Sequence, residues 1–532
     1  MSEQAPSRRY ANYVLFVLVL VYIFNFIDRN ILSILAEDIK ADLGIGDAEM
    51  GFLYGTVFAV FYAVFGIPLA RFADVWTRRS LVSVGLGFWS LMTAASGLAR
   101  SFGTLAACRI GVGIGEASAS PAAYSMLSDY YPPRLRATVI AIYAAGVYIG
   151  AGIGIFLGGY ILEWWATAYP NTADAPLGLK GWQAAFMAVG IPGIILAIWV
   201  RTLREPTRGI SEGLVAEKHP HPFKLLGQEL MAVVPPFNLL GLRTHPKVLR
   251  KNLIIATGIA LGAWFLIWLT GSVAQWVTTG FGVWVTVTWT QSLKIRDYAT
   301  HQMMFGSKAF IYTMLAFPTT AFIGYGAGFW IPPLLLRVHD IGAAEVGLYI
   351  GLGSALGGFL GITLGGMLAD KLKQRIPSGR LIVGYILVAG NGPLLLWLLY
   401  ADSLISAYII NFFLTGFAAC GGGVAPSTAS DLVMPRMRAV AGAFFILLNT
   451  FIGLALGPYV IGEISDVLYA SGMDDAGALR GALALAVLSL IPAVIFLILG
   501  QKHLAKDEHS RLDRARALGE PVDELLSETK PA

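Results

Sequence analysis

Twelve apolar segments of close to 20 residues constrain this chain more than any other feature of its sequence. A helix needs about 20 consecutive apolar residues to cross the hydrocarbon core of a bilayer. The first six segments lie at about 12–35, 48–70, 80–99, 104–127, 138–162 and 183–201. The second six lie at about 309–336, 346–369, 381–400, 404–428, 439–462 and 481–500. The sequence therefore predicts an all-α polytopic membrane protein with two six-helix bundles.

The composition agrees with a membrane protein and excludes a soluble globular one. Of the 532 residues, 56% are hydrophobic and 13% are charged, whereas soluble domains have about 25% charged residues. Both cysteines, Cys108 and Cys420, lie inside apolar segments, so a disulfide framework is not implied. The net charge of +5 arises mainly from basic residues in short loops, which indicates membrane topology rather than nucleic-acid binding.

The basic residues occupy alternate loops between the apolar segments. Cytoplasmic loops of membrane proteins carry an excess of Lys and Arg. The basic loops contain Arg71, Arg78 and Arg79; Arg134 and Arg136; Lys371, Lys373, Arg375 and Arg380; and Arg436 and Arg438. The other loops are mainly acidic or neutral, so we expect both termini to be cytoplasmic, and the membrane to be the plasma (inner) membrane if the source is bacterial.

An insertion at about 203–308 separates the two sets. Its first part is polar and predicts a cytoplasmic linker with one amphipathic helix near 223–240. Its second part, 252–291, is apolar and rich in Trp, with Gly271 and Ser272 near its middle. A single crossing would invert every later loop, so this part crosses twice as a hairpin or not at all, and we expect the hairpin. The predicted domains are 1–202 (N-terminal bundle), 203–308 (linker and hairpin), 309–500 (C-terminal bundle) and 501–532 (cytoplasmic tail).

The two halves also share sequence. The stretch 129–137 recurs at 431–439, with Asp, Pro, Arg, Arg and Ala all displaced by 302 residues. The stretch around Asp74 after the second segment has a counterpart around Asp370 after the eighth. Two matching inner-loop signatures in the same order indicate a duplicated transporter whose site lies between the halves near the midplane.

These signatures resemble the motifs of the major facilitator superfamily. The Gly-x-x-x-Asp-[Arg/Lys] stretches after segments 2 and 8 resemble its motif A, Arg109 in segment 4 resembles motif B, and the glycine series 146, 150, 154 and 158 resembles motif C. Within the superfamily, 26–29, 109–118 and 328–332 resemble the Spinster lipid transporters. The first motif A departs from the family in Ala70 and Val75, and the insertion is unusual. The resemblance implies a major facilitator fold with pseudo-twofold symmetry and alternating access.

A charged cluster is expected inside the N-terminal bundle. Asp28 lies within an apolar segment, where a charge costs about 2.5 to 3.5 kcal/mol on insertion scales. At ~1.5 Å per residue, Asp28 lies ~12 Å, Arg109 ~9 Å and Glu116 ~20 Å below the outer surface. Arg109 and Glu116 are seven residues apart and share a helix face. We therefore predict a cluster of all three in which Asp28 and Glu116 carry protons; a static buried ion pair is the alternative.

The predicted substrate site adds Arg29 and residues of the second half. Arg29 points about 100° away from Asp28 around the helix and suits bidentate capture of an anionic head group; the alternative is that it snorkels or pairs with a backbone carbonyl. The predicted substrate-binding residues are Arg29, Arg109, Tyr325, Phe329, Trp330, Thr415 and Asn449. Aromatic residues in such helices more often serve packing or interface belts.

The duplicated inner-loop residues are predicted to form a gate that pairs when the cytoplasmic side is shut. These residues are Asp74, Arg78, Asp129, Arg136, Asp370 and Arg438. Topology alone would explain basic residues such as Arg78, but it explains the aspartates less well.

The function that we predict is proton-coupled secondary transport of an anionic amphiphile, such as a lysophospholipid or a sphingoid phosphate. The sequence contains no nucleotide-binding motif or histidine spacing for a metal, so we expect no cofactor, no metal and no enzymatic activity. The expected partners are this substrate, protons and the bilayer, with no nucleic acid, and the protein is expected to be monomeric. The alternatives are a proton-coupled symporter of small organic anions, a lipid scramblase that needs no gradient, and a lipid enzyme.

Overall fold

The computed structural model describes residues 7–208, 211, 220–234, 236–339 and 341–522. The described residues form helices joined by short loops, without a strand. By length and composition, 11 of these helices could cross a membrane. The prediction of an all-α polytopic protein is therefore confirmed.

Each of the first six predicted segments contains one helix or several consecutive helices. They are α1 (Arg8–Ile34); α3 (Asp47–Gly51), the π-helix η1 (Phe52–Thr56) and α4 (Val57–Val75); α5 (Arg78–Ser96); α6 (Phe102–Glu116) and α7 (Ala119–Tyr130); α8 (Pro133–Ala168); and α9 (Gly181–Arg201). Helix α2 (Ala36–Leu43) lies between the first two segments. The short 3-10 helices η2 (Thr172–Asp174) and η3 (Pro176–Gly178) lie between α8 and α9. The helices are longer than the predicted apolar segments. Their terminal turns are polar, so these turns are helical without being part of an apolar stretch.

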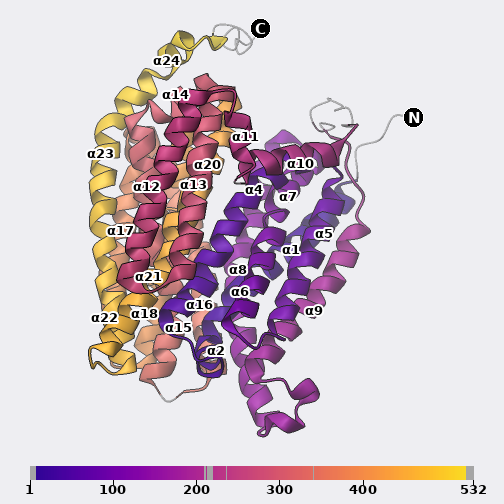
Figure 1. Cartoon of the computed structure of the whole chain (residues 1–532), viewed down its shortest axis with the longest axis vertical. Coiled ribbons are helices and arrows are strands. Elements are labelled where there is room, and N and C mark those ends of the chain that lie inside the picture. Colours follow the sequence, from indigo (N-terminus) through magenta and orange to yellow (C-terminus); the bar gives the residue numbers. More distant parts are fainter. Residues whose placement is uncertain (1–6, 209–210, 212–219, 235, 340, 523–532) are drawn as a thin grey trace.

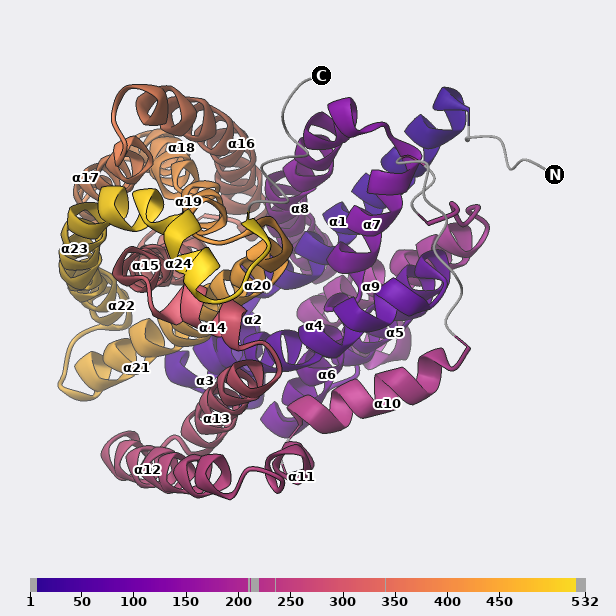
Figure 2. The ribbon, with the colours of Figure 1, turned by 90° about the horizontal axis from the view of Figure 1, so that it is seen from above.

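The second six segments repeat this order. They are α15 (Lys308–Val338); α16 (Ala343–Arg375); α17 (Gly379–Leu399); α18 (Leu404–Cys420) and α19 (Val424–Leu432); η5 (Pro435–Met437), α20 (Arg438–Leu448), the π-helix η6 (Asn449–Ala455) and α21 (Leu456–Ala470); and α22 (Asp475–Ala486), η7 (Val487–Ser489) and α23 (Leu490–His509). The short helix α24 (Arg511–Ala517) follows. Viewed along the bundle, the two sets form two bundles side by side (Figure 2).

The molecule has two distinct ends. The helices α10 (Pro222–Val233), α14 (Tyr298–Phe305) and α24 lie at one end, and α2 lies at the other (Figure 1). We call them the α24 end and the α2 end. The predicted basic loops, which begin at Asp74, Asp129, Asp370 and Asp431, follow α4, α7, α16 and α19. Since α4 and α7 reach the α24 end in Figure 1, the basic loops gather there.

Duplication is visible in the ion pairs as well as in the sequence. Arg78 at the start of α5 donates to Asp129 at the end of α7, with 2.5 Å between Nη1 and Oδ2. Arg380 at the start of α17 pairs with Asp431 at the end of α19. Both members of the second pair are displaced from the first by the 302 residues found in the sequence repeat. Each half thus ties its third helix to its fourth in the same way.

The apolar part of the insertion forms two antiparallel helices, α12 (Pro246–Thr270) and α13 (Val273–Arg296). They turn at Gly271, whose φ of 74° suits glycine because a Cβ would be strained there. Asn252 ties the pair together: its amide nitrogen donates to Thr288 and Gln291, and its amide oxygen accepts from the Trp284 indole. The predicted hairpin is therefore present as a helical pair; its place in the membrane stays a prediction.

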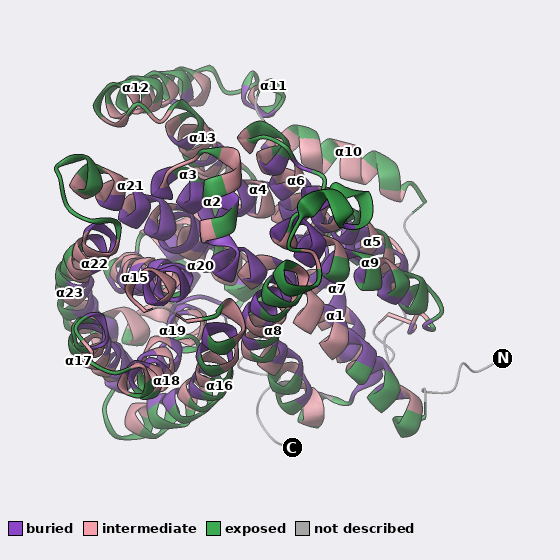
Figure 3. Cartoon of the chain, turned by 90° about the horizontal axis from the view of Figure 1, so that it is seen from below, coloured by how far each residue is buried: buried purple, intermediate pink, exposed green. Residues whose placement is uncertain are grey.

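Within the hairpin, α13 lies against the bundle and α12 lies outside it. Phe281 stacks on Phe61 of α4, and Trp289 stacks on Phe444 of α20. Helix α13 therefore contacts both halves. Helix α12 is mostly exposed at the periphery, as Figure 3 shows, with Asn252 as its one buried residue. The predicted amphipathic helix is α10, whose Phe223 packs on Phe72 and Trp76.

The two halves meet most closely where α8 crosses α16. A Cβ added at Gly152 would lie 2.3 Å from the carbonyl oxygen of Gly351, and one added at Gly351 would lie 2.5 Å from that of Gly152. Real Cβ atoms do not approach so closely, so the two backbones touch only because both residues are glycine. Close backbone contact through small residues is the usual means of helix association in membranes.

Replacing Gly351 with Ala should therefore destabilise the fold. The new methyl group forces α8 and α16 apart, and overpacking of this kind costs about 1 to 3 kcal/mol. We expect a lower thermal melting temperature of the purified protein, measured by loss of the monodisperse chromatographic peak. Gly366→Ala on the same helix is the control, because nothing lies within 4 Å of its added Cβ. Equal melting temperatures for the two variants would contradict the close α8–α16 contact.

Candidate functional site

A cavity of about 450 Å³ lies between the two bundles. The first half contributes residues of α1, η1 and α8, including Tyr22, Arg29 and Tyr54, and the second half contributes the larger part. Among the described residues that line the cavity, Arg29 is the only charged one. The uncharged polar side chains of its wall are Asn30, Thr320, Ser354, Asn391, Asn411, Thr415 and Asn449, together with the tyrosines Tyr22, Tyr54, Tyr148 and Tyr325. The wall is otherwise apolar, so the site combines one cation with a mainly neutral surface.

Arg29 joins the cavity to the interior of the first half. Its Nε donates to Oε2 of Glu116 at 2.6 Å, and the Glu116 side chain is fully buried. Three aromatic rings surround the guanidinium carbon, with Phe26, Phe58 and Tyr62 centroids at 4.8, 4.5 and 4.8 Å. Among the described residues, the Nε group makes the only hydrogen bond of this guanidinium. The two terminal nitrogens therefore remain available to a ligand.

Asp28 lies beside this pair but is not part of it. Its side chain is buried, and neither carboxyl oxygen has a hydrogen-bond partner among the described residues. The polar residues near its side chain include Glu116, Thr93 and Arg109. Burying an unpaired charge is expensive, and protonation removes that charge. Asp28 is thus a buried carboxyl group without a hydrogen-bond partner among the described residues, next to the Arg29–Glu116 pair.

Arg109 is the second buried cation of the cluster. Its guanidinium donates to two backbone carbonyl oxygens, from Nε to Leu53 at 3.2 Å and from Nη1 to Asp28 at 3.3 Å. It also lies 5.3 Å from the centre of the Phe58 ring. Arg109 is buried and does not line the cavity. Its contacts tie α6 to α1 and η1 behind the cavity wall.

The structure shows which of the predicted site residues lie together and which of them line the cavity. Arg29 reaches Glu116, a pairing that the sequence analysis did not consider, because the helix rotation that separates Arg29 from Asp28 directs it toward α6. Of the predicted substrate-binding residues, Arg29, Tyr325, Thr415 and Asn449 line the cavity. Arg109, Phe329 and Trp330 do not. Phe329 instead stacks on Tyr54 at 4.4 Å, and the Trp330 indole donates to the carbonyl of Pro458 at 2.8 Å.

The two halves are joined by charge at the α2 end. Arg337 at the end of α15 donates to Glu37 of α2 at 2.8 Å and to Asp47 of α3 at 2.6 Å. Asp47 also accepts from Lys40 at 2.5 Å and from the Ser465 hydroxyl at 2.7 Å. The side chains of Arg337 and Asp47 are 4% and 3% exposed. This cluster, which we call the α2-end clasp, therefore joins the halves through a nearly dry ion pair.

Two further contacts close the same end. Asp466 of α21 accepts from the backbone N–H groups of Asp47 and Ala48 at 2.9 and 2.8 Å, which satisfies the first turn of α3 from the opposite half. The Ser33 hydroxyl donates to the backbone carbonyl of Phe329 at 2.6 Å. The bundle is thus shut between the cavity and the α2 end.

The predicted gate residues lie at the α24 end and pair within their own halves. Arg78 donates to Asp129 and Glu205, and Arg380 pairs with Asp370 and Asp431. The Arg136 guanidinium donates to the Ser128 carbonyl and the Ser211 hydroxyl. Asp74 lies near Arg208, and Arg438 is exposed. No hydrogen bond or ion pair between described residues joins these loops across the two halves, so their role as a gate stays a prediction for the opposite state.

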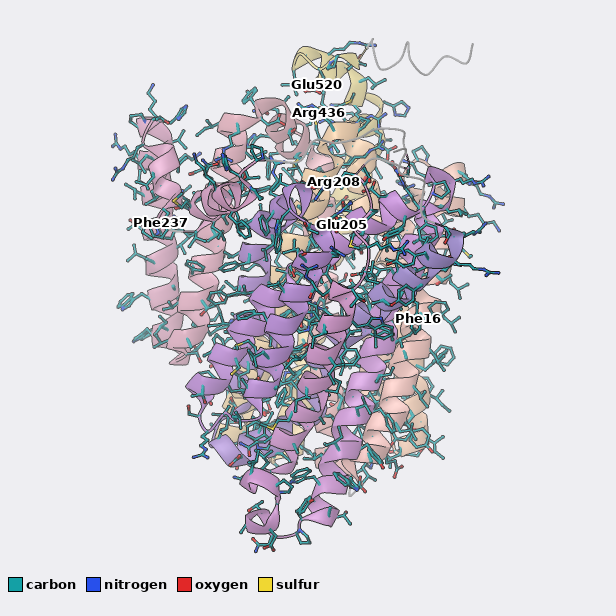
Figure 4. The ribbon with its side chains drawn as sticks, turned by 90° about the vertical axis from the view of Figure 1, so that its right-hand side faces the viewer. Phe16, Glu205, Arg208, Phe237, Arg436 and Glu520 are labelled. Atoms are coloured by element: carbon teal, nitrogen blue, oxygen red, sulfur yellow. The ribbon has the colours of Figure 1, made fainter. Side chains whose placement is uncertain are left out.

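The segment that follows α9 and the tail that follows α23 cover the α24 end. Arg208 donates to the carbonyl oxygens of Ala73 and Trp76, both at 2.6 Å, and so caps α4. Arg436 pairs with Asp297. It also pairs with Glu520, which is labelled beside it in Figure 4. The hydrogen bond from Arg436 lowers the pKa of Asp297 to about 2. The stabilisation from this lowered pKa is present above about pH 4 and is lost as the pH falls toward 2, so the contact is intact at physiological pH.

The comparisons with known proteins agree with this architecture. The sequence profile of the Major Facilitator Superfamily matches residues 18–458. An MFS-type efflux pump of Mycolicibacterium smegmatis is 27% identical over 92% of this chain and 91% of its own length. Protein spinster of Drosophila melanogaster is 24% identical over 85% of this chain and 61% of its own length. A probable galactarate/D-glucarate transporter of Bacillus subtilis is 25% identical over 92% of this chain and 91% of its own length.

A solved structure supports the same relationship. A bacterial homolog of the human lysosomal transporter Spinster, in an inward-facing and occupied conformation, superimposes with a TM-score of 0.69 at 25% identity, over 94% of this chain and 99% of that one. The chain therefore belongs to the major facilitator superfamily. Within that superfamily it is a Spinster-type transporter, an integral multi-pass membrane protein that moves a small molecule.

Proposed function

We propose that this transporter moves an anionic amphiphile, such as a lysophospholipid or a sphingoid phosphate, by alternating access coupled to protons. The observation that carries the proposal is the position of Arg29. Its guanidinium lines the cavity while its Nε is bound to the buried Glu116. A single cation therefore serves both the transported molecule and a carboxylate that is sealed from the cavity.

This arrangement links substrate binding to protonation. An anionic head group that engages the terminal nitrogens of Arg29 competes with Glu116 for the same positive charge. When Glu116 loses part of that charge inside a buried site, a proton stabilises it instead. Asp28, buried beside it without a hydrogen bond among the described residues, is the second site that a proton can occupy. Substrate binding at Arg29 thus favours proton binding at the same cluster.

The remaining wall of the cavity favours an amphiphile. Apart from the Arg29 cation, the cavity wall is formed by apolar and aromatic side chains such as Phe26, Ile155, Phe317 and Phe445, with scattered hydroxyl and amide groups. A long apolar chain gains about 25 cal/mol per Å² when it leaves water for such a surface. A phosphate head at Arg29 and an acyl chain along the second half would use both features.

The direction of opening follows from the basic loops. Since Lys and Arg are concentrated on the cytoplasmic side, we place the α24 end and both termini in the cytoplasm and the α2 end outside, with the α12–α13 hairpin in the bilayer. On this assignment the α2-end clasp shuts the outer side, and the state is inward-facing. The predicted gate residues at the α24 end would pair across the halves in the outward-facing state.

Small organic anions are the second candidate substrate. The similarity of this chain to a probable galactarate/D-glucarate transporter supports this candidate, and a carboxylate would also suit Arg29.

The test of the two candidates uses purified protein in liposomes with and without a pH gradient. The probes are fluorescent lysophosphatidylglycerol and radiolabelled glucarate. We expect the lysolipid to accumulate only with the gradient. Accumulation of glucarate alone would favour the second candidate. Equilibration of the lysolipid without any accumulation under the pH gradient would indicate a scramblase.

Replacing Arg29 with Ala should discriminate between anionic and zwitterionic ligands. A charge-assisted hydrogen bond to a buried group contributes about 1.5 to 3 kcal/mol, so affinity for lysophosphatidylglycerol should fall about 10- to 100-fold. Affinity for lysophosphatidylcholine, whose own cation balances its phosphate, should change far less. The measurement is ligand-induced thermal stabilisation of purified protein. Equal losses for both ligands would show that Arg29 acts only as a structural partner of Glu116.

A further inference from the structure

A second groove lies outside the transport cavity, at the α24 end of the hairpin. It has a volume of about 480 Å³ and is lined by Arg243, Pro246, Leu249, Arg250, Leu253, Ile254 and Thr257. Most of these residues are exposed, and all but Arg243 belong to α12. The groove therefore opens on the outer surface of the hairpin rather than between the bundles.

The groove has a charged end and an apolar end. Arg250, Leu253, Ile254 and Thr257 follow the spacing i, i+3, i+4 and i+7, which places them on one face of a helix. From Arg250 to Thr257 the helix rises about 10 Å. The face begins at two guanidinium groups, since Arg243 adjoins Arg250, and continues as an uncharged strip along α12.

The charge around the groove is of one sign. Between Leu230 and Arg296 the sequence contains six Lys and Arg residues and no Asp or Glu. The six are Arg243, Lys247, Arg250, Lys251, Lys294 and Arg296, and none occurs from 252 to 293. All six thus lie near the start of α12 or the end of α13, at the same end of the hairpin. None forms an ion pair within the part of the chain that the structure describes.

We infer that this groove binds an anionic phospholipid of the surrounding bilayer. The phosphate would lie between Arg243 and Arg250, and one acyl chain would follow the strip formed by Leu253, Ile254 and Thr257. Unpaired basic groups at the end of an apolar helix are the means by which membrane proteins select anionic lipids. The inference rests on the proposed placement of the hairpin in the bilayer, but not on the transported substrate or on proton coupling.

The bound lipid would have a structural effect on the hairpin. Among the described residues, helix α12 packs mainly on α13, and Asn252 is its one buried residue. A lipid held by its head group at one end and by its chain along α12 would fix the depth of the hairpin in the membrane. Helix α13 packs on both α4 and α20. The depth of the hairpin in the membrane would therefore also set the position of α13 against the two halves.

The test compares lipid binding to the full-length protein in neutral detergent by native mass spectrometry. The probes are phosphatidylglycerol and phosphatidylcholine with the same acyl chains, added together in equal amounts. We expect wild-type protein to retain phosphatidylglycerol in preference. The variant R243Q/R250Q should bind phosphatidylglycerol about 25-fold more weakly, because each basic side chain near an anionic lipid contributes a factor of about five. Both arginines are exposed, so the fold should be unaffected.

The control variant is R8Q/R9Q. It removes the same charge from exposed residues near the start of α1, away from the groove, and should keep the wild-type preference. The inference would be overturned if wild-type protein held both lipids equally, or if the two double variants lost phosphatidylglycerol to the same extent. Neither result would bear on the transport proposal, because no gradient or transported substrate enters the measurement.

Discussion

Replacing Glu116 with Gln is expected to reduce gradient-driven uptake to the level of protein-free liposomes. The amide cannot release or accept the coupling proton, but its oxygen can still accept the hydrogen bond from Arg29 Nε, which in the wild type is 2.6 Å long. The fold should therefore persist. Arg29 also loses its anionic competitor, so binding of an anionic lysolipid should be retained or strengthened. This split between binding and driven transport distinguishes a coupling residue from a structural one.

The measurement for this variant has two parts. Uptake of fluorescent lysophosphatidylglycerol into liposomes is followed with and without a pH gradient, and exchange of the same lipid across the membrane is followed at equal pH. Glu116→Gln should lose the uptake driven by the pH gradient and keep the lipid exchange at equal pH. Asp174→Asn, in an exposed loop, is the control for loss of a carboxylate. Driven uptake by Glu116→Gln at the wild-type rate would remove Glu116 from the coupling mechanism.

Replacing Arg337 with Ala is expected to open the α2 end. Removal of Arg337 leaves Asp47, which is 3% exposed, as a buried carboxylate paired only with Lys40 and Ser465. Breaking one partner of a buried ion pair costs about 3 to 5 kcal/mol. Because Arg337 and Asp47 belong to different halves, the cost falls only on the state in which the α2 end is shut. The ratio of shut to open protein should fall by more than about 100-fold.

Distances between spin labels on the two halves can measure this change. Leu177 and Met473 are exposed in loops of the first and second halves, and cysteines there can be labelled once Cys108 and Cys420 are replaced. The parent should give one short distance, and Arg337→Ala should add a longer one. Lys180→Ala is the control, since Lys180 pairs with Asp42 of its own half. An unchanged distance in Arg337→Ala, or the same change in both, would exclude the clasp as a state-dependent contact.

The fold could be predicted from the sequence because the bilayer limits the possible structures. Apolar length fixes the spanning helices, and the 302-residue repeat fixes the division into halves. The glycines at positions 150 and 154 of the motif C series would each bring a Cβ within 3 Å of α1, so the series that the sequence analysis gave as a motif resemblance forms a close helix contact. Helix ends were less predictable, because polar turns continue a helix without an apolar signal.

The site was predictable by residue type but not by pairing. A charge inside an apolar segment marks Asp28, Arg29, Arg109 and Glu116 without any alignment. Which cation meets which carboxylate depends on the rotation of α1 against α6, and sequence spacing within one helix does not contain that angle. Phe329 and Trp330 were assigned to the cavity because aromatic residues suit a lipid, yet both serve contacts near the α2 end.

The α2-end clasp was not predicted, although the sequence held two signals for it. Arg337 is a basic residue at the end of an apolar segment that the topology places in an otherwise acidic region, and it therefore departs from the loop pattern. Asp47 and Glu37 are acidic residues in the first loop of that same side. Similarly, Arg380 and Asp431 stand 302 residues after Arg78 and Asp129, so the repeat could have identified the second ion pair.

The most direct test of proton coupling is to record lumenal pH and lysolipid movement in the same liposomes. With wild-type protein and no initial gradient, adding lysophosphatidylglycerol to one side should produce a lumenal pH change that follows lipid movement and is absent with Glu116→Gln. Lipid movement by wild-type protein without any pH change would contradict the shared use of Arg29 by substrate and carboxylate.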